Sequence, residues 1–186
     1  MDPRLQEMLD HYEITKTLKE YCRGCDRCDE PLMGSIYAAE SWDDHGAVQA
    51  PGRDFARIMI GDILARTETL SHLLGQSVIA VDGDTAGAET YFIAGMRDTR
   101  DDGAAMCNLL GGRFVDRLVR EEDRWRVEHR TVIRDWSVSI PNIDDWTDQA
   151  LLHDGHRSSE DASYTALREQ HGGHPPAQRA QRKQHV

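Results

Sequence analysis

The sequence predicts an α+β protein in which a curved, mainly antiparallel sheet wraps around helices that come first in the chain. Two patterns carry this prediction. Apolar residues recur at helical spacing early in the 186 residues, whereas the pattern changes to that of strands from Leu70, and the stretch from Trp125 to Trp136 is rich in Val, Ile, Thr and Trp and alternates in part. A block of helices followed by a run of strands is typical of α+β folds.

The helical half is predicted to begin at Pro3, because Asp2 is a capping residue and Pro favours the first helical position. Apolar side chains at helical spacing then continue to about residue 28, as one long helix or two abutting ones. The remaining elements of this half are predicted as a helix over residues 29–42 with Trp42 near its end, a turn over 43–46, a strand over 47–50 and a helix over 55–64.

Four consecutive antiparallel strands are predicted in the second half. Asp82-Gly83-Asp84 is a tight-turn signal between the first two strands, and Gly111-Gly112 predicts a bulge or bend within the third. The predicted strands cover residues 70–81, 85–97, 106–119 and 125–136.

Beyond Pro141 the periodic pattern fades, and the sequence predicts three parts. We expect one domain over residues 1–140, an extension over 141–168 that packs on it through Trp146, and a disordered tail over 169–186.

The charge and composition limit the partners of the protein. A net charge of −11 argues against a nucleic acid or an anionic membrane as partner, and favours a neutral or hydrophobic small molecule. No apolar run approaches the length of a membrane span, and the residues after Met1 do not resemble a secretory signal. We therefore expect a cytoplasmic protein.

Cys22, Cys25 and Cys28 have the spacing of a metal-thiolate run, with Cys107 as a possible fourth ligand. They are predicted to lie along a helix and its end, however, whereas thiolate ligands usually come from turns that can wrap the ion. Cys22 and Cys25 also continue the apolar side of that helix, where a free Cys behaves as a small hydrophobic residue. We favour this second interpretation, and expect neither a metal nor a disulfide.

Tyr21, Asp26 and His72 are the candidates for acid–base chemistry. The first two lie near the predicted end of the first helical region, and His72 lies on the first long strand. A carboxylate beside an imidazole orients the ring and stabilises its charged form, which suits proton transfer near neutral pH. From spacing alone an alternative stays open, in which Asp26 and His72 never meet and Tyr21 is a core residue.

Four segments together resemble the SnoaL-like branch of the nuclear-transport-factor-2-like superfamily. The resemblance covers roughly residues 5–140, and implies a cone in which a curved, mixed but mainly antiparallel sheet and three or four helices close around a deep apolar pocket. The segments are Tyr21-x4-Asp26, Ser71-His72-x-x-Gly75, Val81–Ala86 with Glu89-Thr-Tyr91, and Gly111–Arg117 followed by Trp125-Arg-Val-x-x-Arg130.

Enzymes of this branch include dehydratases, a dehydrochlorinase, polyketide cyclases and a lyase that releases formaldehyde. The resemblance implies an Asp26–His72 pair, with Tyr21 matching a dehydratase and Arg130 matching the dehydrochlorinase. Two departures stand out. Tyr21 replaces the lysine of the dehydrochlorinase, and no carboxylate in residues 90–95 matches a second catalytic Asp of the dehydratase.

Each candidate residue has an expected role. His72 would act as general base, Asp26 would fix its tautomer, and Tyr21 would donate a hydrogen bond or proton. Arg113 or Arg130 could bind an oxyanion, or could instead form an outward salt bridge with a carboxylate such as Asp116 or Glu128. The side chains expected to line the pocket are Tyr91, Trp42, Met59 and Leu110, whereas His45, His129 and His153 are assigned to the surface or to turns.

The sequence thus predicts a cofactor-independent lyase that eliminates water or formaldehyde from a hydrophobic, multi-ring, aromatic alcohol. The alternative is a non-catalytic binding or assembly protein of the same fold, as in the small subunits of ring-hydroxylating dioxygenases. An isomerase or epoxide hydrolase shares the fold, but epoxide hydrolysis would need a water-activating polar cluster that the sequence does not reveal. By analogy at the level of the fold we expect a homodimer or homotrimer.

Overall fold

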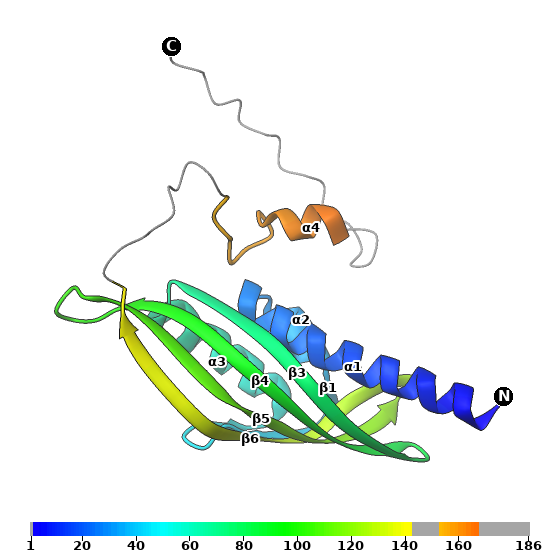
Figure 1. The fold of residues 1–186 in the computed structure, drawn as a ribbon. Helices are drawn as coiled ribbons and strands as arrows, with labels where there is room; N and C mark the ends of the chain where they lie inside the picture. The colour runs from blue at the N-terminus through cyan, green and yellow to red at the C-terminus, as the bar shows by residue number, and fades with distance from the viewer. Residues whose placement is uncertain (1, 143–152, 168–186) are drawn as a thin grey trace.

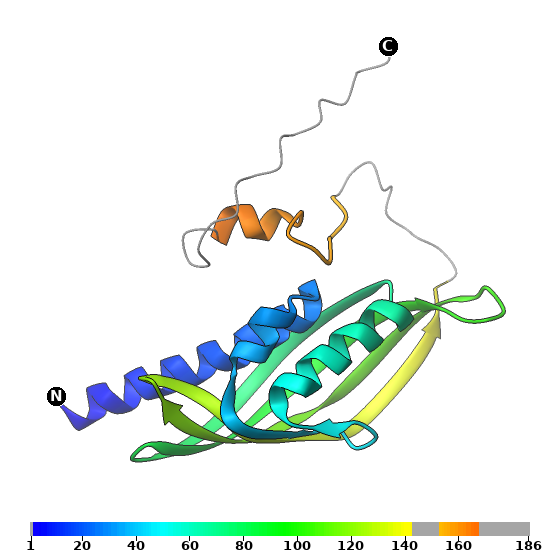
Figure 2. The same ribbon diagram turned by 180° about the vertical axis from the view of Figure 1, so that it is seen from behind.

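The computed structural model describes residues 2–142 and 153–167, in which the first three helices lie on one face of a curved six-stranded sheet (Figures 1 and 2). We call the sheet face toward these helices the inner face and the opposite one the outer face. This arrangement confirms the predicted α+β cone. The elements are α1 (Pro3–Arg27), α2 (Glu30–Ser35), β1 (Tyr37–Asp44), β2 (Gln49–Ala50), α3 (Gly52–Arg66), β3 (Thr69–Asp82), β4 (Thr85–Thr99), β5 (Ala105–Glu121), β6 (Arg124–Pro141) and α4 (Ala162–Leu167).

The strands follow the order β2-β1-β6-β5-β4-β3. Strands β3 to β6 form an antiparallel meander, which confirms the four predicted strands, and β1 runs parallel to β6. The pairing of β5 with β6 shifts by one residue between Gly111 and Gly112, where a bend was predicted. A Cβ on Gly112 would lie 2.0 Å from the carbonyl oxygen of Ile133, so only glycine permits this close approach of the strands.

Helix α1 is one continuous helix with both ends capped. The Asp2 side chain accepts a hydrogen bond from the Arg4 N–H, and Cys28 ends the helix in the left-handed conformation with φ 52°. Gly24 does not interrupt it. This glycine lies where α2 crosses, since a Cβ there would come within 2.7 Å of the Met33 Cβ. Asp26 therefore sits in the last turn of α1.

The prediction of a helix over residues 29–42 is wrong beyond its first turns. Helix α2 ends at Ser35, and the chain continues as β1, which places Trp42 on a strand. The pairing partner of β1 is the distant β6, and the register shifts between Tyr37 and Trp42, so the alternation that marks a strand is broken locally. The predicted strand over 47–50 is present only as β2.

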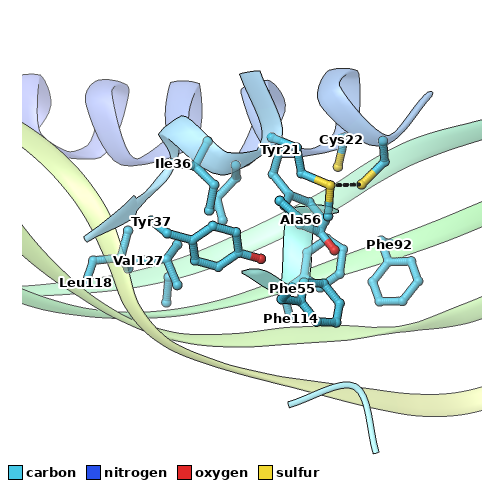
Figure 3. Packing of buried hydrophobic residues seen from close by; sticks show 14 of the residues in the cluster. Tyr21, Cys22, Ile36, Tyr37, Phe55, Ala56, Phe92, Phe114, Leu118 and Val127 are labelled. Carbon is cyan, nitrogen blue, oxygen red and sulfur yellow. Dashed lines mark hydrogen bonds between the residues drawn. The ribbon is translucent and has the colours of Figure 1, made fainter. Parts of the chain in front are cut away.

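The core fills the space between the helices and the inner face (Figure 3). On β4 the burial alternates strictly from Ala86 to Ala94, and Phe92 lies stacked on Phe114 of β5 with ring centroids 4.3 Å apart. Cys25 of α1 contacts Met33 of α2, with 3.6 Å between the two sulfur atoms. The side chains packed together here include Ile14, Leu18, Tyr21, Met33, Ile36, Tyr37, Phe55, Phe92, Phe114, Leu118, Trp125 and Val127.

Residues 153–167 contact the helices through polar side chains. The Arg157 guanidinium donates to the carbonyl oxygens of Ile63 and Thr67, and the Tyr164 hydroxyl donates to Asp29 at 2.8 Å. Trp146 and the tail over 169–186 lie outside the described residues. No helix in the described ranges combines the length and apolar character needed to cross a bilayer.

Candidate active site

Asp26 and His72 meet through two hydrogen bonds. His72 Nδ1 lies 2.6 Å from Asp26 Oδ1, and the backbone N–H of His72 donates to Oδ2 of the same carboxylate at 3.0 Å. A carboxylate that holds both the backbone and the ring of one residue restrains the position and the rotation of that ring. With Nδ1 as the donor, the neutral imidazole presents the lone pair of Nε2 to a reacting atom.

The fold brings this pair together from positions 46 residues apart. Asp26 projects from the last turn of α1, and His72 is on β3, against which α1 packs. His72 pairs in register with Ala94 of β4, and Ala94 pairs with Leu110 of β5. These residues share the inner face, since side chains of directly paired residues point to the same side of a sheet.

The surroundings of the pair are apolar and aromatic. The His72 ring lies 6.1 Å from the Phe92 ring, centroid to centroid, and Phe92 stacks on Phe114. The side chains of His72 and Asp26 remain 10% and 15% exposed, so the pair is largely desolvated but open to a ligand or to water. A low-dielectric setting strengthens the interaction between the imidazolium and the carboxylate.

Tyr21 belongs to a different hydrogen-bonded group from the Asp26–His72 pair. Its hydroxyl shares a hydrogen bond of 3.2 Å with His45 Nε2, and its ring meets Phe114 edge to face at 5.4 Å. Burial of this side chain, aided by the nearby Cys25, Tyr37 and Asp43, raises the pKa of the Tyr21 phenol well above its usual value. Tyr21 therefore holds its proton near neutral pH and acts as a hydrogen-bonding group.

His45 is the functional candidate that sequence reasoning missed, together with its partners Asp43 and Tyr37. The Asp43 carboxylate is fully buried and accepts hydrogen bonds from the Tyr37 hydroxyl and from His45 Nδ1. The His45 ring also stacks on Phe55 of α3, with centroids 4.4 Å apart. The sequence carried no strand signal for this pair, because β1 ends at Asp44 and His45 lies in the turn that follows.

Arg130 lies on the inner face and is fully buried. Its guanidinium donates two hydrogen bonds, of 2.7 and 2.8 Å, to Asp116, its register partner on β5. It also lies over the rings of Tyr21 and Phe114, at 4.2 and 4.3 Å. Burial disfavours the charge, but the attraction and hydrogen bonds of Asp116 keep the pKa of Arg130 well above its ordinary value.

One nitrogen of this guanidinium is left without a partner. Among the described residues, Nη1 of Arg130 is buried and makes no hydrogen bond. A buried donor of this kind is costly unless something accepts from it, so Nη1 could serve an oxygen of a ligand or a bound water. The salt bridge to Asp116 that the sequence left open thus exists, but it points inward.

Arg113, Tyr91 and Trp42 lie on the outer face, away from His72, so the expectation that they contact a ligand there is not met. Arg113 pairs with Glu89 and Asp135 and lies over the Tyr91 ring, its register partner. Trp42 is 41% exposed and next to the inward-facing Asp43. Alternation along a strand explains these positions, because Phe92, Phe114 and Asp43 take the inner face.

Met59 and Leu110 are partly buried and pack against the core, as expected for residues that line an interior. Leu110 lies in the same cross-strand row as His72. The aromatic residues nearest the pair, Phe92 and Phe114, were not among the candidates. Their inward alternation on β4 and β5 is the signal that could have found them.

The cysteines behave as core residues where they are buried. Burial raises the pKa of the Cys22 thiol to about 12, and that of Cys25 well above its usual value, which favours the protonated and uncharged forms. In the described part of the chain, no three or more His, Cys, Asp or Glu side chains group so that they could hold a metal ion.

The fold and the site define a class: a cone-shaped α+β protein with a His–carboxylate pair on the inner face of its sheet. A SnoaL-like domain matches residues 6–131. The match spans more than half of the chain, so the protein belongs to the SnoaL-like family. The resemblance expected from the sequence is confirmed.

Individual relatives are distant. An uncharacterized protein of Mycobacterium tuberculosis is 24% identical over 127 residues, which cover 67% of this chain and 84% of that protein. Among solved structures, a candidate scytalone dehydratase from Novosphingobium aromaticivorans superposes with a TM-score of 0.64 at 16% identity, covering 71% of this chain and 88% of the other.

Two further structures have other activities in their names. A hexachlorocyclohexane dehydrochlorinase from Novosphingobium barchaimii has a TM-score of 0.68 at 12% identity, covering 78% of this chain and 99% of the other. The β subunit of a candidate aromatic-ring-hydroxylating dioxygenase from Novosphingobium aromaticivorans has a TM-score of 0.55 at 19% identity, covering 71% and 92%. At these identities the likeness establishes the fold.

Proposed function

We propose that the protein is a cofactor-independent lyase that uses His72 as a general base, held by Asp26, on a hydrophobic multi-ring alcohol. The observation that carries this proposal is the double hydrogen bond from His72 to Asp26, with 2.6 Å between Nδ1 and Oδ1. It fixes the ring and leaves Nε2 for the reacting atom, which is the arrangement that a general base requires.

In the proposed reaction, Nε2 of His72 takes a proton from the substrate and the ring becomes positively charged. Asp26 stabilises this imidazolium without itself accepting the proton. The electron pair released at carbon forms a new double bond as water departs. In the formaldehyde-releasing variant the base instead takes a proton from a terminal hydroxyl, and the O–H electrons form the C=O bond of formaldehyde. The pair of the broken carbon–carbon bond then forms the new C=C bond, while the hydroxyl on the neighbouring carbon departs and is protonated to water.

The negative charge that develops needs a partner, and Tyr21 on α1 and Arg130 on the inner face of the sheet can supply it. Tyr21 keeps its proton because burial raises its pKa, so its hydroxyl can donate to a departing oxygen. Arg130 carries an unpaired Nη1 above the Tyr21 ring, and guanidinium stays charged when buried.

The aromatic surroundings favour a flat, hydrophobic substrate. Phe92 and Phe114 are stacked on the inner face, and Tyr21 and His72 flank this stack. Aromatic rings prefer stacked and edge-to-face neighbours, which a multi-ring aromatic alcohol would provide. One structural neighbour is named as a candidate dehydratase and another as a dehydrochlorinase, and both names denote eliminations, which supports the same reaction class here.

A non-catalytic role in binding or assembly is the alternative, and the likeness to a dioxygenase β subunit supports it. The double hydrogen bond at Asp26 favours the enzyme, because plain binding of an apolar ligand would not require a restrained base. A cytoplasmic location is part of the proposal and is tested by fractionating cells that express the tagged protein.

The test is a cofactor-free incubation with a panel of polycyclic and diaryl alcohols, with scytalone and hexachlorocyclohexane added. Wild type is compared with His72→Gln and with His153→Gln, whose side chain is exposed. We expect turnover by wild type and by the control, and a loss of about 100- to 10,000-fold in His72→Gln. Mass spectrometry separates loss of water from loss of formaldehyde.

Two results would count against the proposal. Turnover that survives in His72→Gln would remove His72 from the chemistry. Absence of turnover, with equal thermal stabilisation of wild type and variant by the same compounds, would favour the binding protein.

A further inference from the structure

The hydrogen-bonded chain Tyr37–Asp43–His45–Tyr21 is a second His–carboxylate group that the Asp26–His72 pair does not use. It is assembled from the start and end of β1, the turn before β2 and the middle of α1. An imidazole between a buried carboxylate and a phenol is the arrangement of a proton relay, because its two nitrogens contact two different partners.

The direction of each hydrogen bond follows from which groups of the chain can donate and which can only accept. The Asp43 carboxylate can only accept, so Tyr37 donates to one oxygen and His45 Nδ1–H donates to the other. When His45 is neutral, its Nε2 is an acceptor and takes the hydrogen bond of the Tyr21 hydroxyl. When His45 is protonated, Nε2–H donates to Tyr21, and the proton of Tyr21 is then free to point to a third atom.

His45 also connects a buried phenol with solvent. Tyr21 is 2% exposed and Asp43 is fully buried, whereas the His45 side chain is 19% exposed. A proton lost from Tyr21 therefore has a short route to solvent through Nε2 of His45.

The ion pairs around this group leave Asp43 and His45 to each other. Arg130 is neutralised by Asp116, and within the described residues the ion pair of Asp43 is the one with His45. A buried carboxylate is costly unless it is paired, and His45 is the partner that Asp43 has in the described part of the chain. The titratable and charged groups facing the Tyr21–His45 contact are Cys25 on α1, Tyr37 and Asp43 on β1 and Arg130 on β6, while α3 contributes the apolar Phe55.

We propose that His45 and Asp43 are positioning residues that supply and withdraw the proton of Tyr21, while Tyr21 is the group that contacts the substrate. The catalytic use of this relay rests on the proposed lyase function. Figure 3 shows Tyr21 and Phe114 close together in the core, and the Phe114–Phe92 stack leads on toward His72. The base and the acid thus lie at opposite ends of one aromatic row.

In the elimination of water, each proton and electron pair has a defined donor and acceptor. His72 Nε2 takes the proton from carbon, and the electrons of that C–H bond form the C=C bond while the C–O bond breaks with its pair on oxygen. That oxygen takes the proton of Tyr21, and Tyr21 recovers a proton from Nε2–H of protonated His45. His72 then releases its proton to water, and His45 takes one up through its exposed edge.

The relay can be tested without a substrate by NMR of protein labelled with ¹³C at the ζ carbon of tyrosine. In wild type, we expect the Tyr21 signal to shift with pH as His45 titrates. This step should vanish in His45→Gln and persist in His72→Gln. Asp43→Asn should weaken it, because the group that holds His45 Nδ1 is then a neutral amide. Tyr12→Phe, at a position that is 68% exposed, is the control that shows which changes in the tyrosine signals arise from a substitution away from this group.

The relay is refuted if the Tyr21 step persists in His45→Gln or follows His72 instead. Near-ultraviolet circular dichroism of each variant verifies that the fold is retained, and a misfolded His45→Gln is replaced by His45→Asn. These outcomes do not depend on turnover, so failure of the relay and failure of the lyase proposal are distinguishable.

The role of the relay in catalysis is then tested by steady-state kinetics with any compound that the wild-type protein converts. His45→Gln should lower kcat by about 10- to 100-fold with little change in KM, since it removes a proton source and no substrate contact. The fall of the rate at alkaline pH should disappear. A double variant with Tyr21→Phe should be no slower than Tyr21→Phe alone, whereas losses that multiply would show that His45 acts independently of Tyr21.

Discussion

Replacing Asp116 by Asn should destabilise the protein severely, because it leaves the Arg130 charge buried without a counter-ion. Both side chains are 0% exposed, and the guanidinium donates to both carboxylate oxygens at 2.7 and 2.8 Å. Two unit charges about 4 Å apart attract by about 4 kcal/mol at an effective dielectric constant of about 20. Removing one partner of a buried pair costs about 3–5 kcal/mol.

That cost is a large share of the stability of an ordinary domain, which is about 5–15 kcal/mol. The measurement is urea unfolding followed by circular dichroism. The matched control is Glu128→Gln, because Glu128 pairs with Arg117 on the same two strands but on the outer face, where Arg117 is 66% exposed. An exposed pair contributes less than about 1 kcal/mol, so the control should unfold close to wild type.

A double variant completes the test. Asp116→Leu with Arg130→Met removes both charges and should recover most of the stability, since apolar side chains of similar size often replace a buried ion pair at little cost. The reasoning is refuted if Asp116→Asn costs no more than Glu128→Gln. It is also refuted if the double variant is as unstable as the sum of its single changes.

Four further substitutions have expected outcomes. Gly24→Ala should lower the free energy of unfolding by about 1–2 kcal/mol, because the added Cβ would lie 2.7 Å from Met33. Gly61→Ala should raise the free energy of unfolding, because a Cβ there meets nothing within 4 Å and Ala favours the helix over Gly. The melting temperatures of the two variants test both statements. Asp10 accepts from Arg120 and Trp125, whose hydrogen bonds lower its pKa against the opposing effect of burial. The stabilisation that the Asp10 carboxylate contributes is therefore present above its unfolded-state pKa of about 4, and it is lost as pH falls through the lower pKa that Asp10 has in the native state. In unfolding experiments, Asp10→Asn should therefore differ from wild type far more at pH 7 than at pH 2. The homodimer or homotrimer stays a prediction, and Ile93→Glu on the apolar outer face should yield monomers in sedimentation if that face forms the contact; an unchanged mass would exclude it.

The elements with strong local patterns were predictable from the sequence. The cap at Asp2, the tight turn around Gly83 and the glycine pair at 111–112 each act within a few residues, so their signals survive without knowledge of the fold. Strand β1 was mistaken for helix because its pairing with β6 is a tertiary event. Local periodicity cannot report a partner more than 80 residues away.

The same distinction holds for the site. Asp26 and His72 could be paired only through the family resemblance, since nothing local joins α1 to β3. The faces of Arg113 and Arg130 depended on registers that the sequence left open, and the structure puts them on opposite sides of the sheet. His45 was assigned to a turn, where it does lie, but its contact with Tyr21 depends on how α1 crosses the sheet.

One feature of α1 sets a scale for the ligand. Tyr21 and Asp26 lie five residues apart on the same unbroken helix, so their separation along its axis is about 7.5 Å, fixed by the rise of about 1.5 Å per residue. No loop can stretch or shorten this distance. In the proposed reaction, α1 thus helps to set the reach of the ligand, because it holds the acid Tyr21 at a fixed axial distance from Asp26, whose hydrogen bonds position the base His72.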